Sequence, residues 1–204
     1  MNTKMHTGRV GHACRRSLLM AILVAASTAP ATAQAADLDA LTKTARTAAK
    51  SLVSSLKTEL KSALKEGGPV HAVSFCKITA PAIAAAQSVE FGMQVERTAL
   101  RVRNPANAPD AFERETMEQF LAEVAAGKDL ATLERAEIVT NDDGTKTFRF
   151  LKPIPMGAQP CLACHGSSIK PEVSKVISDA YPEDQAVGFK PGDLRGAFSI
   201  SKPL

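Results

Sequence analysis

Two cysteines and a histidine lie close together late in the chain, in the sequence Cys161-Leu162-Ala163-Cys164-His165. Two thiols three residues apart can each add to one vinyl group of a porphyrin, and the next residue can then place its imidazole beneath the iron. The pattern C-x-x-C-H is the attachment signature for c-type haem. The segment therefore predicts one haem c, attached through Cys161 and Cys164, with His165 as the proximal iron ligand.

The same cysteine spacing also occurs in thiol oxidoreductases and zinc sites, so the surrounding sequence has to discriminate between them. A thioredoxin-type motif lies within a parallel βαβ unit, whereas this one follows a predicted hairpin and a proline-rich loop. A zinc site would have to recruit Cys76 or His71, because there is no second C-x-x-C. The export signal described below favours haem over zinc or a plain disulfide, since haem is joined to c-type proteins outside the cytoplasm.

The iron would still need a second axial ligand, for which Cys76 is one candidate. Cys76 lies next to Phe75 on the apolar face of a predicted helix, where a haem could pack. A buried structural role is equally open to it, because a free cysteine behaves as a small hydrophobic residue. His71 lies on a different helical face, and Met156 lies too close to the attachment segment to cross the ring easily. The other candidates are Met93, Met117 and the lysines.

Residues 1–35 have the three parts of a secretory signal peptide. Four basic residues and no acidic one are followed by an apolar stretch from Leu18 to Ala26 and by the cleavage site Ala33-Gln34-Ala35. Arg15-Arg16 loosely resembles a twin-arginine signal, so the export route stays open. Cleavage would also remove Cys14 and leave three cysteines, an odd number for an exported protein.

The formal charge of +4, from 25 Lys and Arg against 21 Asp and Glu, falls to zero once residues 1–35 are removed. The charge therefore gives no reason to expect a nucleic-acid partner. No apolar run reaches the roughly 18 residues that span a bilayer, so we expect a periplasmic protein without a membrane anchor. Its partner would be a periplasmic redox or signalling protein, and its oligomeric state stays open.

Apolar residues recur at steps of three and four from Asp37 to Glu66, which predicts a long amphipathic helix ended by Gly67-Gly68-Pro69. Pro69 can open a second helix that carries Cys76. Pro81 removes a main-chain donor from that helix, which predicts a kink or a restart. Two shorter helices and four strands follow, with a hairpin turn at 141–144; the helices cover 112–127 and 171–180, and the strands 93–102, 136–140, 146–151 and 196–201. These elements predict one α+β domain, residues 36–204, with an antiparallel sheet.

Several segments resemble a known family. Phe75-Cys76 precedes Ala80-Pro81-Ala82-Ile83-Ala84, and the segment 97–110 contains Arg103-Asn104-Pro105. Together with the late C-x-x-C-H and the closing Gly192-Asp193 and Arg195-Gly196-Ala197, they are similar to a family of secreted single-haem c-type proteins with a PAS-like fold. That family, long labelled a domain of unknown function, occurs alone and as the extracytoplasmic part of bacterial signalling proteins. The resemblance runs from about Leu38 to the end, with Phe112 where the family usually has a larger aromatic residue.

The resemblance implies that His165 ligates the haem iron on one side and the Cys76 thiolate on the other. It also implies a PAS-like antiparallel sheet covered by the long N-terminal helix, with helices packed around one haem. Arg97, Arg101 and Arg103 are candidate partners for the haem propionates, because guanidinium groups bind carboxylates well. For each arginine, a solvated charge on an exposed strand or loop is the alternative.

We expect a haem protein that is not an enzyme, because no Ser/His/Asp set, paired-carboxylate site or phosphate loop stands out. An anionic thiolate stabilises ferric iron, so a His/Cys haem should have a low potential. One function is redox or diatomic-gas sensing through a partner, in which loss of the Cys76 bond opens the iron to a gas. The alternative is a soluble low-potential electron-transfer cytochrome c. A four-helix cytochrome is disfavoured by the hairpin.

Overall fold

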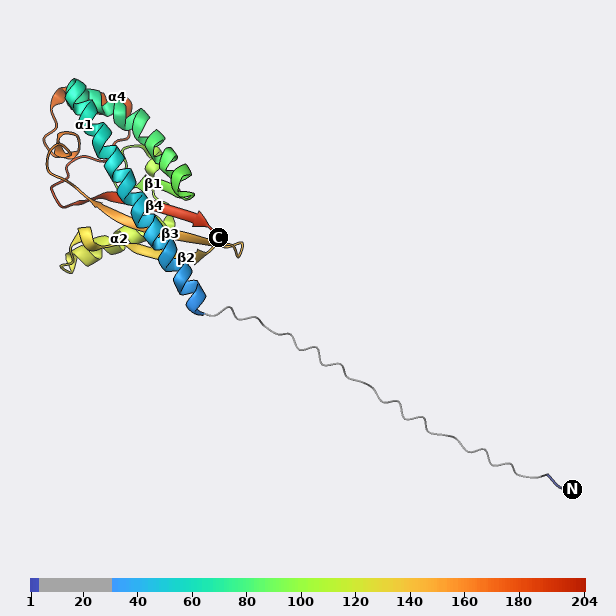
Figure 1. Ribbon diagram of the computed structural model, residues 1–204. Helices are drawn as coiled ribbons and strands as arrows, with labels where there is room; N and C mark the ends of the chain where they lie inside the picture. Colours follow the sequence, from blue (N-terminus) through green and yellow to red (C-terminus); the bar gives the residue numbers. More distant parts are fainter. Residues whose placement is uncertain (4–30) are drawn as a thin grey trace.

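The computed structural model describes residues 1–3 and 31–204. Most of the predicted signal peptide therefore lies outside the described residues, and only its last five positions fall in a described helix. In the described part, a long helix and a shorter helix lie on opposite sides of a four-stranded sheet (Figure 1). This arrangement confirms the predicted α+β class.

The long helix α1 (Ala31–Phe91) is interrupted where the glycines predict it to end. The backbone leaves helical angles at Gly67 and Gly68. Gly68 has a φ of +69°, a left-handed conformation that glycine adopts without strain. The interruption divides α1 into a first arm, residues 31–66, and a second arm, residues 69–91, and the chain reverses direction between them (Figure 1).

The second arm continues through Pro81 with helical backbone angles, so the predicted restart there is wrong. Pro81 removes the amide that would bond the carbonyl of Lys77. Because Lys77 is exposed, water can satisfy that carbonyl, and the helix persists. The arm therefore carries Cys76 and Ala80 on one unbroken helical face.

Four antiparallel strands form the sheet, in the order β1-β4-β3-β2. They are β1 (Gln94–Thr98), β2 (Arg135–Thr140), β3 (Lys146–Pro155) and β4 (Leu194–Pro203). The hairpin predicted around residues 141–144 joins β2 to β3, and its Gly144 has a φ of +81°. β4 comes last in the chain but pairs with both β1 and β3, so it occupies the interior of the sheet.

Side chains alternate between the two faces of the sheet, and each face has its own core. On one face, Phe150 and Ile200 pack against Leu52 from the first arm of α1. On the other face, Leu151 packs against Met117 of α2 (Ala111–Ala125). The pleat of the strands thus separates one apolar sequence into two layers.

Short elements connect these layers and hold the predicted motif. Helix α4 (Pro171–Ala180) has the predicted bounds and packs through Val173 and Ile177 on Val73 of the second arm. The sequence did not predict α3 (Leu162–His165), η1 (Pro105–Asn107) or η2 (Leu130–Thr132). These elements have three or four residues, too few to show a periodic pattern.

One stretch of the described chain, Asp37–Phe91, is long and apolar enough to cross a membrane by length and composition. This corrects the expectation that no such stretch exists. Length and composition alone do not establish a membrane span, because core helices of soluble proteins can pass the same test; in this helix 22% of the apolar window is buried.

Candidate functional site

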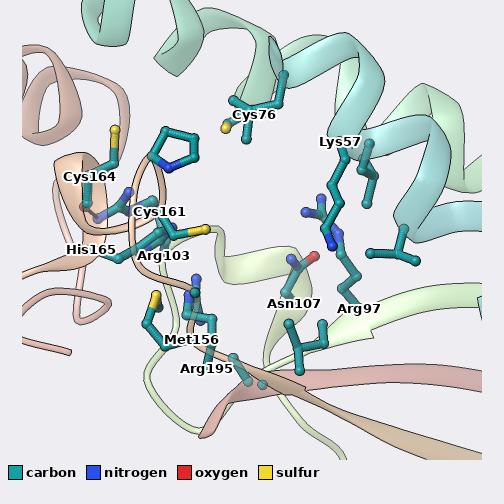
Figure 2. A pocket seen from close by; sticks show the side chains of 18 of the residues that line it. Lys57, Cys76, Arg97, Arg103, Asn107, Met156, Cys161, Cys164, His165 and Arg195 are labelled. Atoms are coloured by element: carbon teal, nitrogen blue, oxygen red, sulfur yellow. Dashed lines mark hydrogen bonds between the residues drawn. The ribbon is translucent and has the colours of Figure 1, made fainter. Parts of the chain in front are cut away.

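A cavity lies between both arms of α1, one end of the sheet and the loop that carries the C-x-x-C-H motif (Figure 2). It brings together the two motif cysteines, His165 and Cys76, which come from segments about 90 residues apart. Its walls are mainly apolar, and in the described part of the chain no Asp or Glu lines them. The apolar side chains include Val53, Leu56, Leu60, Leu64, Val73, Phe75, Ile154 and Phe198.

The short helix α3 presents the motif to the cavity. Cys161 begins this turn, and its carbonyl accepts hydrogen bonds from the amides of Cys164, at 3.2 Å, and His165, at 3.1 Å. Both motif cysteines are free thiols. Gly157 leaves room for the first of them, because a Cβ at that position would lie 3.0 Å from Cys161 Sγ.

A backbone carbonyl determines which nitrogen of His165 is free. Nδ1 of the imidazole lies 2.7 Å from the carbonyl oxygen of Ala186. A neutral ring that donates from Nδ1 leaves Nε2 unprotonated, which is the state a metal ligand needs. Burial, followed by the nearby charges of Arg195 and Arg103, lowers the pKa of His165 to about 3. The imidazole is therefore neutral at ordinary pH.

Cys76 faces the cavity from the second arm of α1, across from the motif (Figure 2). Burial raises the pKa of its thiol, while the positive charges of Arg97, Arg103 and Arg195 act in the opposite direction. The cations favour the thiolate form, and burial favours the neutral thiol. If the sulfur bonds a metal, the bond offsets the cost of burying its charge, and the cations then add to the stability of the thiolate. Tyr181, the single tyrosine of the chain, also lines the cavity, and its pKa is raised by burial and by the nearby Cys76.

The other candidate ligands occupy different places. The side chain of His71, which the sequence places on a different helical face from Cys76, is 52% exposed, and its Nε2 lies 3.6 Å from Oε2 of Glu66. Met93 and Met117 are buried in the two cores of the sheet. Met156 lines the cavity and packs with Cys161, on the attachment side where the sequence places it.

The three arginines singled out in the sequence have different positions. Arg97 lines the cavity, at the end where Figure 2 also shows Lys57 and Asn107. Arg103 lines it too but forms a buried ion pair with Asp184. Arg101 is exposed and does not line the cavity, because its guanidinium stacks on the ring of Phe189, 4.1 Å from the centroid, and donates to backbone carbonyls.

Arg195 is a cavity residue whose position the sequence does not predict. In the register between β3 and β4, Ile154 pairs with Gly196 and Pro155 with Leu194, so Arg195 has no partner. Such a bulge redirects a side chain, and Arg195 lines the cavity. Burial and the neighbouring arginines lower its pKa to about 10. No sequence pattern predicts this bulge. Lys57 also lines the cavity, but its sequence context does not distinguish it from the other lysines of its helix.

The residues present fit a c-type haem. The cavity offers two thiols, an imidazole with one nitrogen free, and a third thiol on the opposite wall, between apolar surfaces that suit a porphyrin face. Cations at one end suit its two carboxylates. The alternatives from the sequence are less well supported: the sheet is antiparallel rather than parallel, and among the described residues no three His, Cys, Asp or Glu side chains form a metal-binding group.

The fold and the cavity define a class: an α+β protein with a long N-terminal helix, in which a histidine and three thiols face an apolar cavity. The chain belongs to the Tll0287-like family, whose model matches residues 29–203. It resembles the crystal structure of the cyanobacterial heme-protein Tll0287, with 26% sequence identity, a TM-score of 0.53, and coverage of 82% of this chain and 95% of the other. No curated protein matches the chain. The resemblance to a haem-protein family and the expected fold are thereby confirmed.

Proposed function

We propose that this protein binds one haem c, attached through Cys161 and Cys164 and ligated by His165. The observation that carries the proposal is the imidazole of His165, which is partly buried, neutral and held through Nδ1 beside two free thiols. In the attachment, each thiol adds across a vinyl double bond, so that sulfur bonds one carbon, the hydrogen goes to the other and no oxidant is consumed. The likeness to a cyanobacterial heme-protein supports this function.

Cys76 is the proposed second axial ligand. It is the cavity-lining thiol that the attachment does not use, and it projects from the wall opposite the motif. The bound iron would supply redox chemistry, and an anionic sulfur ligand favours its ferric state. Arg97, Arg103 and Arg195 lower the cost of keeping that sulfur ionised.

The cationic end of the cavity is the proposed site of the haem propionates. Arg97 and Lys57 lie there with the amide of Asn107, and Arg195 lies nearer the motif, beside Met156 (Figure 2). Guanidinium groups donate two hydrogen bonds to a carboxylate, and such charge-assisted bonds are the strong ones. We therefore keep Arg97 as a proposed propionate partner and add Arg195 and Lys57. Arg101 is no longer proposed, because it does not line the cavity.

We further propose a redox or diatomic-gas sensing role in the periplasm, exerted through a protein partner and without catalysis. The supporting feature is the position of Cys76 on the second arm, which the Gly67–Gly68 interruption separates from the first. A change at the iron–sulfur bond would act directly on this helix. The alternative, a low-potential electron carrier, would use the same haem without any change of ligand.

An absorption spectrum of the protein purified from periplasm, in both redox states, tests the haem proposal. We expect a c-type spectrum and a haem that stays with the chain after denaturation. Cys161→Ala with Cys164→Ala should abolish covalent retention, and Cys76→Ala should shift the Soret band and raise the potential. His71→Gln is the matched control, because this exposed histidine lies outside the cavity. An unchanged Soret band and potential in Cys76→Ala would refute thiolate ligation.

Carbon monoxide distinguishes the two roles. A sensor should bind it in the ferrous state with spectral loss of the sulfur ligand, whereas a carrier should stay six-coordinate and exchange electrons quickly with a respiratory partner. Failure to bind carbon monoxide, together with fast electron exchange, would overturn the sensing proposal and favour the carrier. Fractionation of cells that express the full chain tests the periplasmic location.

A further inference from the structure

The loop formed by residues 184–189 lies against the motif and holds His165 through backbone groups. Ala186 accepts the hydrogen bond from His165 Nδ1, at 2.7 Å. The amide of Phe189 donates to the carbonyl of His165, and the amide of Gly188 donates to that of Gly166, both at 2.9 Å. The orientation of the imidazole therefore depends on where this loop is held.

Arg103 connects the loop to the motif. Its Nη2 donates to the carbonyl of Cys164, at 2.6 Å, and to the carbonyl of Ala186, at 3.1 Å. Its Nε and Nη2 also donate to the two carboxylate oxygens of Asp184, at 3.0 and 2.9 Å. Nη2 has two hydrogens for three acceptors, so one of these hydrogens is shared between two of them. One oxygen of Asp184 in turn accepts from the amide of Ala186, at 2.8 Å. Both side chains are 9% exposed, so little water competes for these bonds.

The carbonyl of Ala186 is therefore shared between the imidazole of His165 and the guanidinium of Arg103. A carbonyl that accepts from a cation has less electron density to give to a second donor. The hydrogen bond from Nδ1 of His165 is weaker than it would be to an unshared carbonyl, and the imidazole has less anionic character. A less anionic imidazole stabilises ferric iron less and so raises the potential.

We propose that Arg103 and Asp184 form a positioning pair for His165 that fixes the imidazole and moderates the strength of its Nδ1 hydrogen bond. This inference rests on the proposed function, since it concerns a histidine that ligates iron. It replaces the role expected for Arg103 as a propionate partner, because its hydrogen bonds are directed to the motif and the loop. Arg103 would tune the potential through His165 rather than as a propionate partner.

Three variants of the haem-loaded protein test the pair. Arg103→Lys keeps the charge, but a lysine cannot reproduce the fork that reaches Asp184 and two carbonyls together. Arg103→Gln removes the charge as well. Asp184→Asn keeps an oxygen that can accept from the amide of Ala186, but it removes the negative charge and one of the two acceptors that bind Arg103. Arg149→Lys is the matched control, because Arg149 is a similarly buried arginine, paired with Asp110, outside the cavity.

The measurements are the midpoint potential and the solvent exchange of the Nδ1 proton of His165, followed by NMR of the ferric protein. We expect exchange at least about tenfold faster in Arg103→Lys and in Asp184→Asn, because the loop should open more often once a hydrogen bond to a charged group is lost. In the closed loop the Nδ1 bond of Arg103→Lys should nevertheless be stronger, since the carbonyl of Ala186 is no longer shared. We also expect a lower potential in Arg103→Lys despite its unchanged charge. The Arg149→Lys control should match the wild type in both measurements.

The outcomes separate the two proposals. A wild-type protein without His165-ligated haem would overturn both. A normal wild-type haem with unchanged exchange in Arg103→Lys and Asp184→Asn would overturn the positioning pair alone. A potential that falls in Arg103→Gln but not in Arg103→Lys would show that Arg103 acts only through its charge, which would overturn the shared-carbonyl mechanism.

Discussion

Acid should destabilise the haem-free protein through His165. Burial and two nearby arginines lower the pKa of this imidazole to about 3, from an ordinary value of 6.5. Between those two values the unfolded chain binds a proton at this position and the folded chain does not. The free energy of unfolding should therefore be unaffected by this group above pH 6.5 and should fall as the pH falls toward 3.

The size of the effect follows from the same two pKa values. Integrating the proton uptake of one such group from pH 7 to pH 4 gives a loss of about 3 kcal/mol. Most of that loss occurs below pH 6, because above it the unfolded imidazole is also mainly neutral. A loss of this size is a large part of the stability of a typical domain.

Urea unfolding at pH 7, 6, 5 and 4, followed by circular dichroism, measures the effect. Carboxylates also titrate in this range, so the informative quantity is the difference between wild type and His165→Gln. The difference should change by about 3 kcal/mol between pH 7 and pH 4. His71→Gln, the exposed control, should follow the wild type. Parallel pH profiles of wild type and His165→Gln would refute the reasoning from burial.

Three further substitutions test the scaffold, each by urea unfolding at pH 7. Leu52→Ala should cost about 3 kcal/mol, because Leu52 is fully buried in the core between α1 and the sheet. Gly196→Ala should cost about 2 kcal/mol or more, since a Cβ there would lie 2.3 Å from the backbone oxygen of Thr98. Asp110→Ala should cost about 1 kcal/mol, because Asp110 and Glu113 form a capping box at the start of α2.

Each of these predictions has a contradicting result. A loss below about 1 kcal/mol in Leu52→Ala would mean that the core closes around the missing side chain. Gly196→Ala at wild-type stability would show that β1 and β4 can separate at no cost. An Asp110→Ala loss that disappears when Arg149 is also replaced would assign the effect to their ion pair rather than to the cap.

Local patterns predicted the elements well where one residue type dominates the backbone. Gly67-Gly68-Pro69 predicted the interruption of α1, and Asn141 to Gly144 predicted the hairpin. The break predicted at Pro81 is wrong, because the cost of the missing amide depends on whether the carbonyl of Lys77 is exposed, and a sequence does not show this. β1 ends at Thr98 and is shorter than expected, because the amide of Ala99 donates to the carbonyl of Asn107 instead of continuing the strand. A sequence does not show this contact either.

Site residues could be predicted where their spacing in the sequence indicates the chemistry. They could not be predicted where tertiary structure brings distant residues together. Cys161, Cys164 and His165 follow from five consecutive residues, and the structure places Cys76 in the same cavity. Arg195 reaches the cavity through an irregularity in pairing between two strands. The partners of Arg103 lie 61 to 83 residues away in the chain. No periodicity connects such distant positions.

The place of β4 in the sheet governs the order in which the molecule can be completed. β1 pairs in the sheet with β4, and β4 is made after every other strand. Until β4 inserts, β1 and β3 each have an unpaired edge. The C-x-x-C-H segment precedes β4 in the chain, so its thiols emerge before Arg195 and Phe198 can enclose the cavity. The proposed haem attachment could therefore precede insertion of β4, the strand that closes the cavity.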